Sequence, residues 1–242
     1  AASDVYKRQA QQSCATGAGD YEAVVLSDGP SAYWRMNDQG STLADSVGEN
    51  HGTLPPEANT GRPSLVVGGD PAIQLVSETE LKLEAPLPIS ATGDPSDEFT
   101  FEAWIDGYVY GGLYIQAGPF TGVKFFDGEE TFGFLRFDDG TSVGLDFYPS
   151  PGSALPDPVH IALTVDDTTA ELYVNGVLSE QAATNGRTPN WDFSTELRLG
   201  PPTSANADDL TFDEVAFYDR ALGNGEILEH YEAGSGTLTD LD

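Results

Sequence analysis

The stretch from Asp157 to Gly176, DPVHIALTVDDTTAELYVNG, constrains the fold of this chain more than any other. Apolar residues recur at every second position over Val159–Val165 and again over Ala170–Val174, and this period predicts β-strands with one buried face. Asn175-Gly176 follows at once, and this dipeptide favours a type I′ turn because both residues must take a positive φ. The stretch therefore predicts an antiparallel meander with a third strand over Val177–Gln181.

The rest of the chain consists of short apolar runs separated by Gly, Pro, Asn and Asp. Helical spacing is seen in a short turn from Tyr21, ended by Asp28-Gly29-Pro30, and in Ala221–Ala233, which Gly234 ends. Residues 38–54 are expected to form a loop. Further strands are expected at Ala32–Met36, Leu65–Val67, Ala72–Leu75, Glu80–Leu83, Glu98–Asp106, Tyr108–Gln116, Val123–Phe126, Thr131–Phe137, Ser142–Phe147, Glu196–Leu199 and Leu210–Tyr218.

These elements predict an all-β fold, namely a two-sheet antiparallel jelly-roll sandwich with short helical turns near the start and end of the domain. Composition shows no break between residues 20 and 234, which are expected to form one domain. Residues 1–19 read as a polar N-terminal arm and residues 235–242 as an acidic tail. Because residues 3–9, SDVYKRQ, resemble a translated sequencing adapter, the native start is expected to differ.

The charge balance limits the classes of partner. With 40 acidic and 10 basic residues, the chain carries a formal net charge of −30. Such a charge repels nucleic-acid phosphates and anionic membranes, so nucleic-acid binding is not expected. It favours hard cations such as calcium, and adaptation to a salty environment explains it equally well. No apolar run approaches the roughly 20 residues of a membrane span, so membrane insertion is not expected. The single cysteine, Cys14, cannot form an internal disulfide.

Four separated phrases carry a family resemblance. They are AYWRMND with DSVGENHGT, FTFEAW, VHIALTVDDTTAELYVNGVL and FDEVAFYDRALGNGEILEHYEAG. In content and order they resemble the concanavalin A-like lectin/glucanase superfamily, specifically its laminin-G-like jelly-roll group, over about residues 20–234. The resemblance implies two antiparallel sheets, one of them concave, with a binding region on the concave side or its rim loops. It implies less about function, because this fold carries lectins, adhesion modules, glycosidases and inert structural modules.

An enzymatic function is not expected. The glucanase branch carries its catalytic acids as Glu-x-Asp-x-x-Glu on one strand, and this spacing does not occur in the sequence. His51, His160 and His230 are too dispersed in sequence to indicate a site, and the last two are expected to be structural. A glycoside hydrolase is therefore the third hypothesis, behind two without catalysis.

The resemblance also implies a structural calcium ion. Family members often hold one with a carboxylate from the last strand and oxygens from an early Asp/Gly loop, and the matching positions here are Asp213 and Asp45. Calcium prefers several oxygen ligands, which such a pair of segments could offer. The alternative is that Asp213 only caps turn backbone by hydrogen bonds.

Sugar binding requires aromatic faces for the apolar side of a ring and polar groups for its hydroxyls. Trp34 and Trp104 lie in apolar strands and are expected in the core, whereas Trp191 lies in a loop of Asn, Pro and Asp. The predicted ligand-binding residues are Trp191, Tyr108, Tyr110 and Asn206.

Two functions fit these features. The first is a non-catalytic recognition or adhesion module that binds a glycan or a protein surface, located extracellularly or at a cell surface. The second is a structural or decoration subunit of a virion or surface assembly, with a partner protein or further copies of the chain as its partners.

Overall fold

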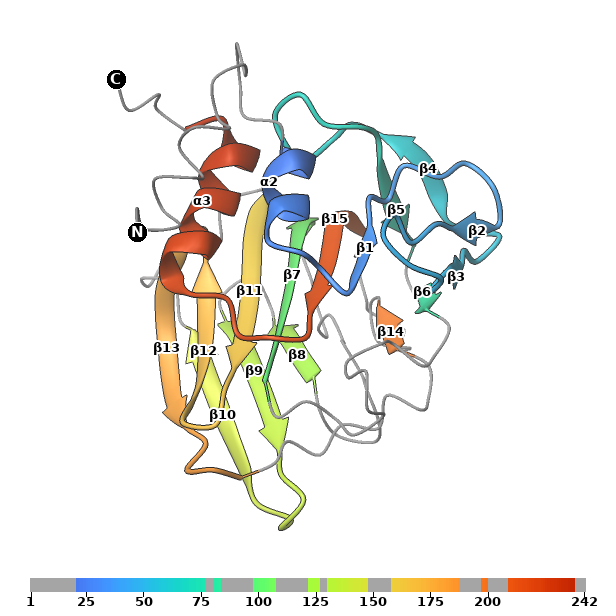
Figure 1. Ribbon diagram of the computed structural model, residues 1–242. Coiled ribbons are helices and arrows are strands. Elements are labelled where there is room, and N and C mark those ends of the chain that lie inside the picture. Colours follow the sequence, from blue (N-terminus) through green and yellow to red (C-terminus); the bar gives the residue numbers. More distant parts are fainter. Residues whose placement is uncertain are drawn as a thin grey trace.

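The computed structural model describes residues 21–76, 81–83, 98–107, 122–126, 130–147, 158–187, 197–199 and 209–237. These residues form antiparallel sheets and two helices, which Figure 1 labels in chain order. The expected all-β antiparallel fold is confirmed. The N-terminal arm, the acidic tail beyond residue 237 and the expected strand Tyr108–Gln116 lie outside the described residues.

Eight strands form the large sheet among the described residues. Seven of them follow the order β13 (Val177–Ala183), β12 (Thr169–Val174), β11 (Val159–Val165), β7 (Phe99–Asp106), β15 (Leu210–Tyr218), β5 (Ala72–Leu75) and β4 (Asn59–Arg62). The eighth, β1 (Ala32–Trp34), also pairs with β15. Strands that are distant in sequence therefore lie side by side at the centre of the sheet, as Figure 1 shows for β7, β11 and β15.

Two smaller sheets and two helices complete the described fold. The three-stranded sheet has the order β10 (Ser142–Phe147), β9 (Glu130–Arg136) and β8 (Gly122–Phe126). The four-stranded sheet has the order β14 (Leu197–Leu199), β6 (Leu81–Leu83), β3 (Gly52–Thr53) and β2 (Thr42–Leu43). The helices are α2 (Tyr21–Ser27) and α3 (Asn224–Ser235). Neither described helix is long and apolar enough to cross a membrane.

The predicted meander is confirmed. β11 pairs with β12 and β12 with β13, both antiparallel, and the tight turn lies at Asn175-Gly176. Both turn residues have a positive φ, of 51° and 75°, as a type I′ turn requires. The outer side of this turn also contacts α3, because a Cβ added at Gly176 would lie 3.0 Å from Leu228.

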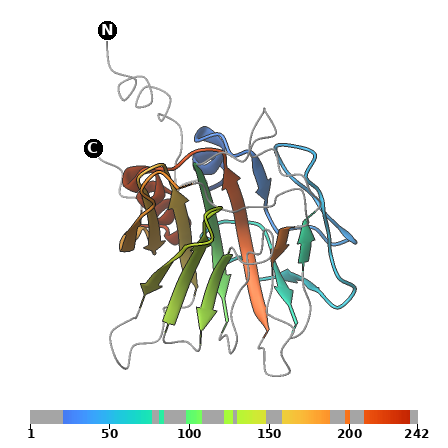
Figure 2. The same ribbon diagram turned by 90° about the horizontal axis from the view of Figure 1, so that it is seen from below.

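The central strands bury both of their faces. On β7, Phe99, Phe101 and Ile105 enter one cluster, which also contains Leu135 from β9 and therefore fills the space between the sheets. Alternation places the other β7 residues on the opposite face, where a second cluster lies under the helices. Figure 2 shows α2 and α3 together on one side of the large sheet. The expected sandwich accounts for the face of β7 in the first cluster, and the helical layer accounts for the face in the second.

Trp104 anchors this second layer. It is buried, as expected, but it belongs to the cluster beneath the helices rather than to the interior of the sandwich. Its indole stacks on Tyr231 of α3 with ring centroids 5.8 Å apart. Gly234 permits this close approach, because a Cβ there would lie 2.5 Å from Trp104 Cζ2. Gly234 was expected to end the helix, but α3 continues to Ser235 and ends at Gly236, whose φ is 70°. Gly234 is therefore a packing residue within the helix.

Two local predictions are wrong. Leu65–Val67 was expected to be a strand but forms bends and a turn. The Asp213 carboxylate accepts a hydrogen bond from the backbone N–H of Leu65, so this amide is not available to a strand partner. Residues 38–54 were expected to be a loop but include the two-residue strands β2 and β3, which pair with each other. Strand β4 was not predicted, because its sequence, NTGR, lacks apolar residues.

Candidate functional site

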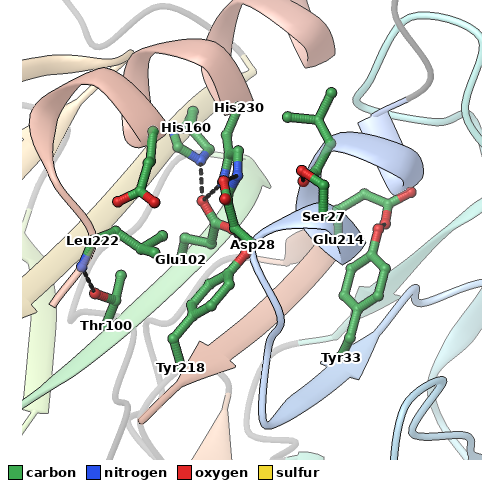
Figure 3. A network of polar contacts seen from close by, with 12 residues as sticks. Ser27, Asp28, Tyr33, Thr100, Glu102, His160, Glu214, Tyr218, Leu222 and His230 are labelled. Atoms are coloured by element: carbon green, nitrogen blue, oxygen red, sulfur yellow. Dashed lines mark hydrogen bonds and ion pairs between the residues drawn. The ribbon is translucent and has the colours of Figure 1, made fainter. Parts of the chain in front are cut away.

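A buried polar network lies between the large sheet and the helices, with Glu102 of β7 at its centre. The Glu102 carboxylate accepts hydrogen bonds from Tyr218 Oη at 2.6 Å and from His230 Nδ1 at 2.9 Å. His160 Nε2 lies 3.1 Å from the same carboxylate. The side chains of Glu102, His160 and His230 are fully buried, and Figure 3 shows the two imidazoles directed at the one carboxylate.

His230 links this network to the end of α2. Its Nε2 lies 3.1 Å from Asp28 Oδ2, so its ring stands between two carboxylates and donates to both when protonated. Arg220 donates to the backbone carbonyl of Asp28 and to Glu226 in α3. Thr100 of β7 also accepts a hydrogen bond from the N–H of Leu222 (Figure 3). Polar contacts therefore hold both helices to the sheet.

The network favours a positively charged His230 beside a negatively charged Glu102. Burial opposes the charged form of His230, but the Glu102 carboxylate and Asp28 outweigh this effect and raise the His230 pKa to about 10. Burial likewise opposes the ionised form of Glu102, but the charge of His230 and the hydrogen bonds from both histidines hold its pKa far below the usual range.

A second acidic group lies where β15 bulges. Glu214 has a positive φ of 51° and accepts a hydrogen bond from the Tyr33 hydroxyl (Figure 3). Burial, with the adjacent charge of Asp213, raises the Glu214 pKa to about 8. Burial also raises the pKa of Asp213 to about 6, although Leu65 and Ser64 donate hydrogen bonds to its Oδ2. Asp213 Oδ1 is buried and has no partner among the described residues.

Asp45, the other predicted calcium ligand, caps its own loop. Its Oδ1 accepts hydrogen bonds from the N–H groups of Tyr33 and Val47, and its Oδ2 accepts them from the backbone and side-chain amides of Asn50. Burial opposes its ionisation, but these donors outweigh that effect and lower the pKa of Asp45. N–H groups point at both carboxylate oxygens of Asp45, and such an arrangement fits the capping of a turn better than the binding of a cation. The same capping role was the alternative expected for Asp213 from the sequence.

Calcium binding stays a prediction. Of the carboxylate oxygens of Asp45 and Asp213, Asp213 Oδ1 is the one without a hydrogen-bond partner among the described residues. No group of three or more His, Cys, Asp or Glu side chains in the described part of the chain could hold a metal ion. If calcium is structural, EDTA lowers the melting temperature by a few degrees and calcium restores it. Magnesium and NaCl serve as controls, because screening of the net charge also stabilises the chain. A melting temperature unchanged by EDTA contradicts the prediction.

The four predicted ligand-binding residues, Trp191, Tyr108, Tyr110 and Asn206, lie outside the described residues, so their role stays a prediction. The sequence missed the site that the structure does describe. His160 and His230 were judged too dispersed to belong together, yet both contact Glu102, 58 and 128 residues away in sequence. A signal was present in Glu102, a charged residue within the apolar run FTFEAW, where an unpaired charge would be costly to bury.

The chemistry of this network is that of a structural anchor. Its central carboxylate and both imidazoles are inaccessible to solvent and engaged with each other or with neighbouring side chains. A general acid or base must reach a substrate atom within hydrogen-bond distance. The described network offers no such access, so it stabilises the helical layer instead.

Comparison with solved structures shows the same fold in toxin binding domains. The binding domain of Paraclostridial Mosquitocidal Protein 1 matches with a TM-score of 0.65 and 15% identity, over 86% of this chain and 53% of that one. The botulinum neurotoxin serotype D binding domain matches with a TM-score of 0.67 and 13% identity, over 86% and 52%. The botulinum neurotoxin type G receptor-binding domain matches with a TM-score of 0.60 and 16% identity, over 84% and 51%. The chain thus spans about half the length of these structures.

The sequence comparisons define the family. No curated protein is significantly similar to the sequence. A family model described as the concanavalin A-like lectin/glucanases superfamily, in its laminin-G-like group, matches residues 82–228. This match runs from β6 into α3 and covers more than half of the 242 residues. The resemblance seen in the sequence is confirmed: the chain belongs to the concanavalin A-like lectin/glucanases superfamily.

Proposed function

We propose that this chain is a non-catalytic recognition module that binds a glycan or a protein surface outside the cytoplasm. The observation that carries the proposal is the burial of the clustered titratable side chains. Glu102, His160 and His230 are sealed under α2 and α3, where they anchor the fold. We therefore assign ligand binding to surface loops, which the β-sandwich positions as a rigid scaffold.

The comparisons support a binding role. The similar structures are binding or receptor-binding domains by name, and their likeness to this chain lies in the fold. The family contains lectins as well as glucanases by its description. We assign ligand contact to the loop residues Trp191, Tyr108, Tyr110 and Asn206, because an aromatic face packs against a sugar ring while an amide pairs with its hydroxyls.

A glycan array with the full chain tests the proposal. We expect binding to a restricted set of glycans, and we expect Trp191→Ala to lower the signal at least tenfold, because an aromatic platform supplies much of the contact area. Val177→Ala is the matched control, since Val177 is an apolar residue with 63% of its surface exposed on a described hairpin. Both variants are compared at equal folded fraction by circular dichroism.

Three outcomes decide between the functions. Binding to no glycan removes the glycan part of the proposal. Equal binding by wild type and Trp191→Ala removes the assigned site. Release of reducing ends from a bound glycan during long incubation contradicts the non-catalytic role and restores the glycosidase hypothesis.

A further inference from the structure

A pocket of about 320 Å³ opens on the helical side of the large sheet. One wall is the segment 62–67, and the remaining lining residues are Asp106 at the end of β7, Pro158 before β11 and Thr211 in β15. Thr211 and Asp106 face each other in the register of the two strands. The pocket therefore lies over the ends of three neighbouring strands, and its volume is at the lower end for small-ligand sites.

The wall of the pocket is fixed by hydrogen bonds. Asp213, two residues after Thr211, accepts hydrogen bonds from Leu65 N at 2.8 Å and from Ser64 Oγ at 3.0 Å. The N–H of Val67 donates to the carbonyl of Gly234 in α3 at 2.8 Å. The segment is thus tied both to the sheet and to the helix. A ligand would meet a preformed wall and would not have to order it, which lowers the cost of binding.

Arg62 is the positively charged residue in the lining of the pocket. The other arginines with described side chains are committed, since Arg35 pairs with Glu22, Arg220 pairs with Glu226, and Arg187 donates to backbone carbonyls. Arg62 is exposed, and although its backbone belongs to β4, its guanidinium makes no hydrogen bond or ion pair with any described residue. In a chain of net charge −30, an uncommitted guanidinium beside a pocket is well suited to recognise an anionic group, and its planar fork suits a carboxylate.

The other lining residues restrict the kind of ligand whose carboxylate could pair with Arg62. Asp106 accepts hydrogen bonds and repels a bare anion, so the ligand must present donors such as hydroxyls away from its charge. Thr211 adds a hydroxyl. Pro63, Pro158 and the exposed Val67 offer apolar surface to the face of a ring. A small inorganic anion would satisfy Arg62 alone and would leave these other groups unused.

We propose that this pocket binds one carboxylate-bearing sugar unit, either free or at the end of a glycan. Arg62 pairs with the carboxylate, Asp106 accepts from ring hydroxyls, and the prolines pack against the ring. This inference goes beyond the function proposed above, because the pocket contains none of the loop residues assigned there. Affinity for a single unit is expected to be weak, with a dissociation constant on the order of 1 mM.

The test is a titration of the full chain, labelled with ¹⁵N, by sodium glucuronate at constant ionic strength. We expect saturable shifts at the amides of Val67, Asp106 and Thr211. Glucose, which lacks the carboxylate, and sodium acetate, which lacks the ring, are the matched probes and are expected to bind at least tenfold more weakly. Comparing the dissociation constants of galacturonate and glucuronate shows whether the orientation of the ring hydroxyls affects binding.

The variants test each role. Arg62→Met keeps the aliphatic stem and is expected to raise the dissociation constant at least tenfold, since it removes a charge-assisted contact. Asp106→Asn, which keeps shape but loses the acceptor charge, is expected to weaken glucuronate binding less. Asn224→Asp is the control for charge, because it lowers the net charge by one unit, as Arg62→Met does. Asn224 begins α3, whereas the pocket wall contacts Gly234 near the other end of this helix, so binding is expected to stay unchanged.

The results also separate this proposal from the preceding one. Absence of saturable shifts at the three amides overturns the pocket, as does Arg62→Met binding like the wild type. Acetate binding as tightly as glucuronate overturns the sugar assignment. None of these results depends on the array signal of Trp191→Ala, so either proposal can fail while the other stands.

Discussion

Replacing His230 with alanine is expected to destabilise the protein by about 3–5 kcal/mol. The substitution removes the positive partner that Glu102 and Asp28 share and leaves two buried carboxylates facing a cavity. The loss is measured as the change in the free energy of unfolding, from urea denaturation at pH 6 followed by circular dichroism. Because His230 is the polar link between α3 and β7, the helical signal is expected to fall with or before the signal of the sheet.

Two further variants locate the cause of this loss. Glu229→Ala changes the preceding residue of α3, which is not part of the network, and is expected to shift the free energy of unfolding by no more than about 0.5 kcal/mol. The double substitution Glu102→Leu with His230→Leu removes both charges together. It is expected to cost less than the sum of Glu102→Leu and His230→Leu measured separately, because the Glu102–His230 pair is removed whole and Asp28 still faces Arg220. A loss below about 1 kcal/mol for His230→Ala would show that the network does not hold the helix.

The strands of the sandwich could be predicted because their information is local. β11 and β15 were predicted with the bounds that the structure shows, since alternation of apolar residues and the flanking turn residues suffice to define them. β4 could not be predicted, because it pairs through its backbone with β5 and carries no apolar pattern. Its turn-like sequence, with Gly61 at a φ of 74°, bends the strand at a register shift.

The described site could not be predicted because its information is long-range. The contact between His230 and Asp28 joins residues 202 positions apart, and it exists only because α2 and α3 cover the same face of the sheet. Likewise, Arg62 lies beside Thr211 only after β5 has been placed between β4 and β15. Residue type could indicate that Glu102 needs a partner, but only the topology identifies the partner as a pair of histidines.

The second large effect is a loss of stability as the pH rises above neutrality. The folded-state pKa of His230 is about 10, whereas the unfolded value is near 6.5. Its contribution is therefore complete below about pH 6.5 and is lost as the pH rises through 10. Within this window the folded state binds up to one more proton than the unfolded state, which gives a slope of about −1.4 kcal/mol per pH unit.

The other buried acids in this layer fix the optimum. The lowered pKa of Glu102 contributes stability that is present above about pH 4.5, its unfolded value, and is lost as the pH falls below it. The raised pKa values of Asp213 and Glu214, about 6 and about 8, instead favour the folded state at lower pH and add to the loss on raising the pH. We therefore expect the highest free energy of unfolding at about pH 4.5, where Glu102 has become ionised in both states and the losses from Asp213 and Glu214 are only beginning.

Urea denaturation at half-unit steps from pH 4 to pH 10, at constant ionic strength, measures this profile. His230→Gln is the diagnostic variant, because its side chain can still donate a hydrogen bond but does not titrate. Its profile is expected to keep the part of the slope below pH 8 that Glu214 supplies and to be flat from pH 8 to 9.5, where the wild type still loses stability. Parallel profiles for the two proteins above pH 8 would mean that His230 carries no extra proton in the folded state, and that the helical layer is held by packing around Trp104 rather than by charge.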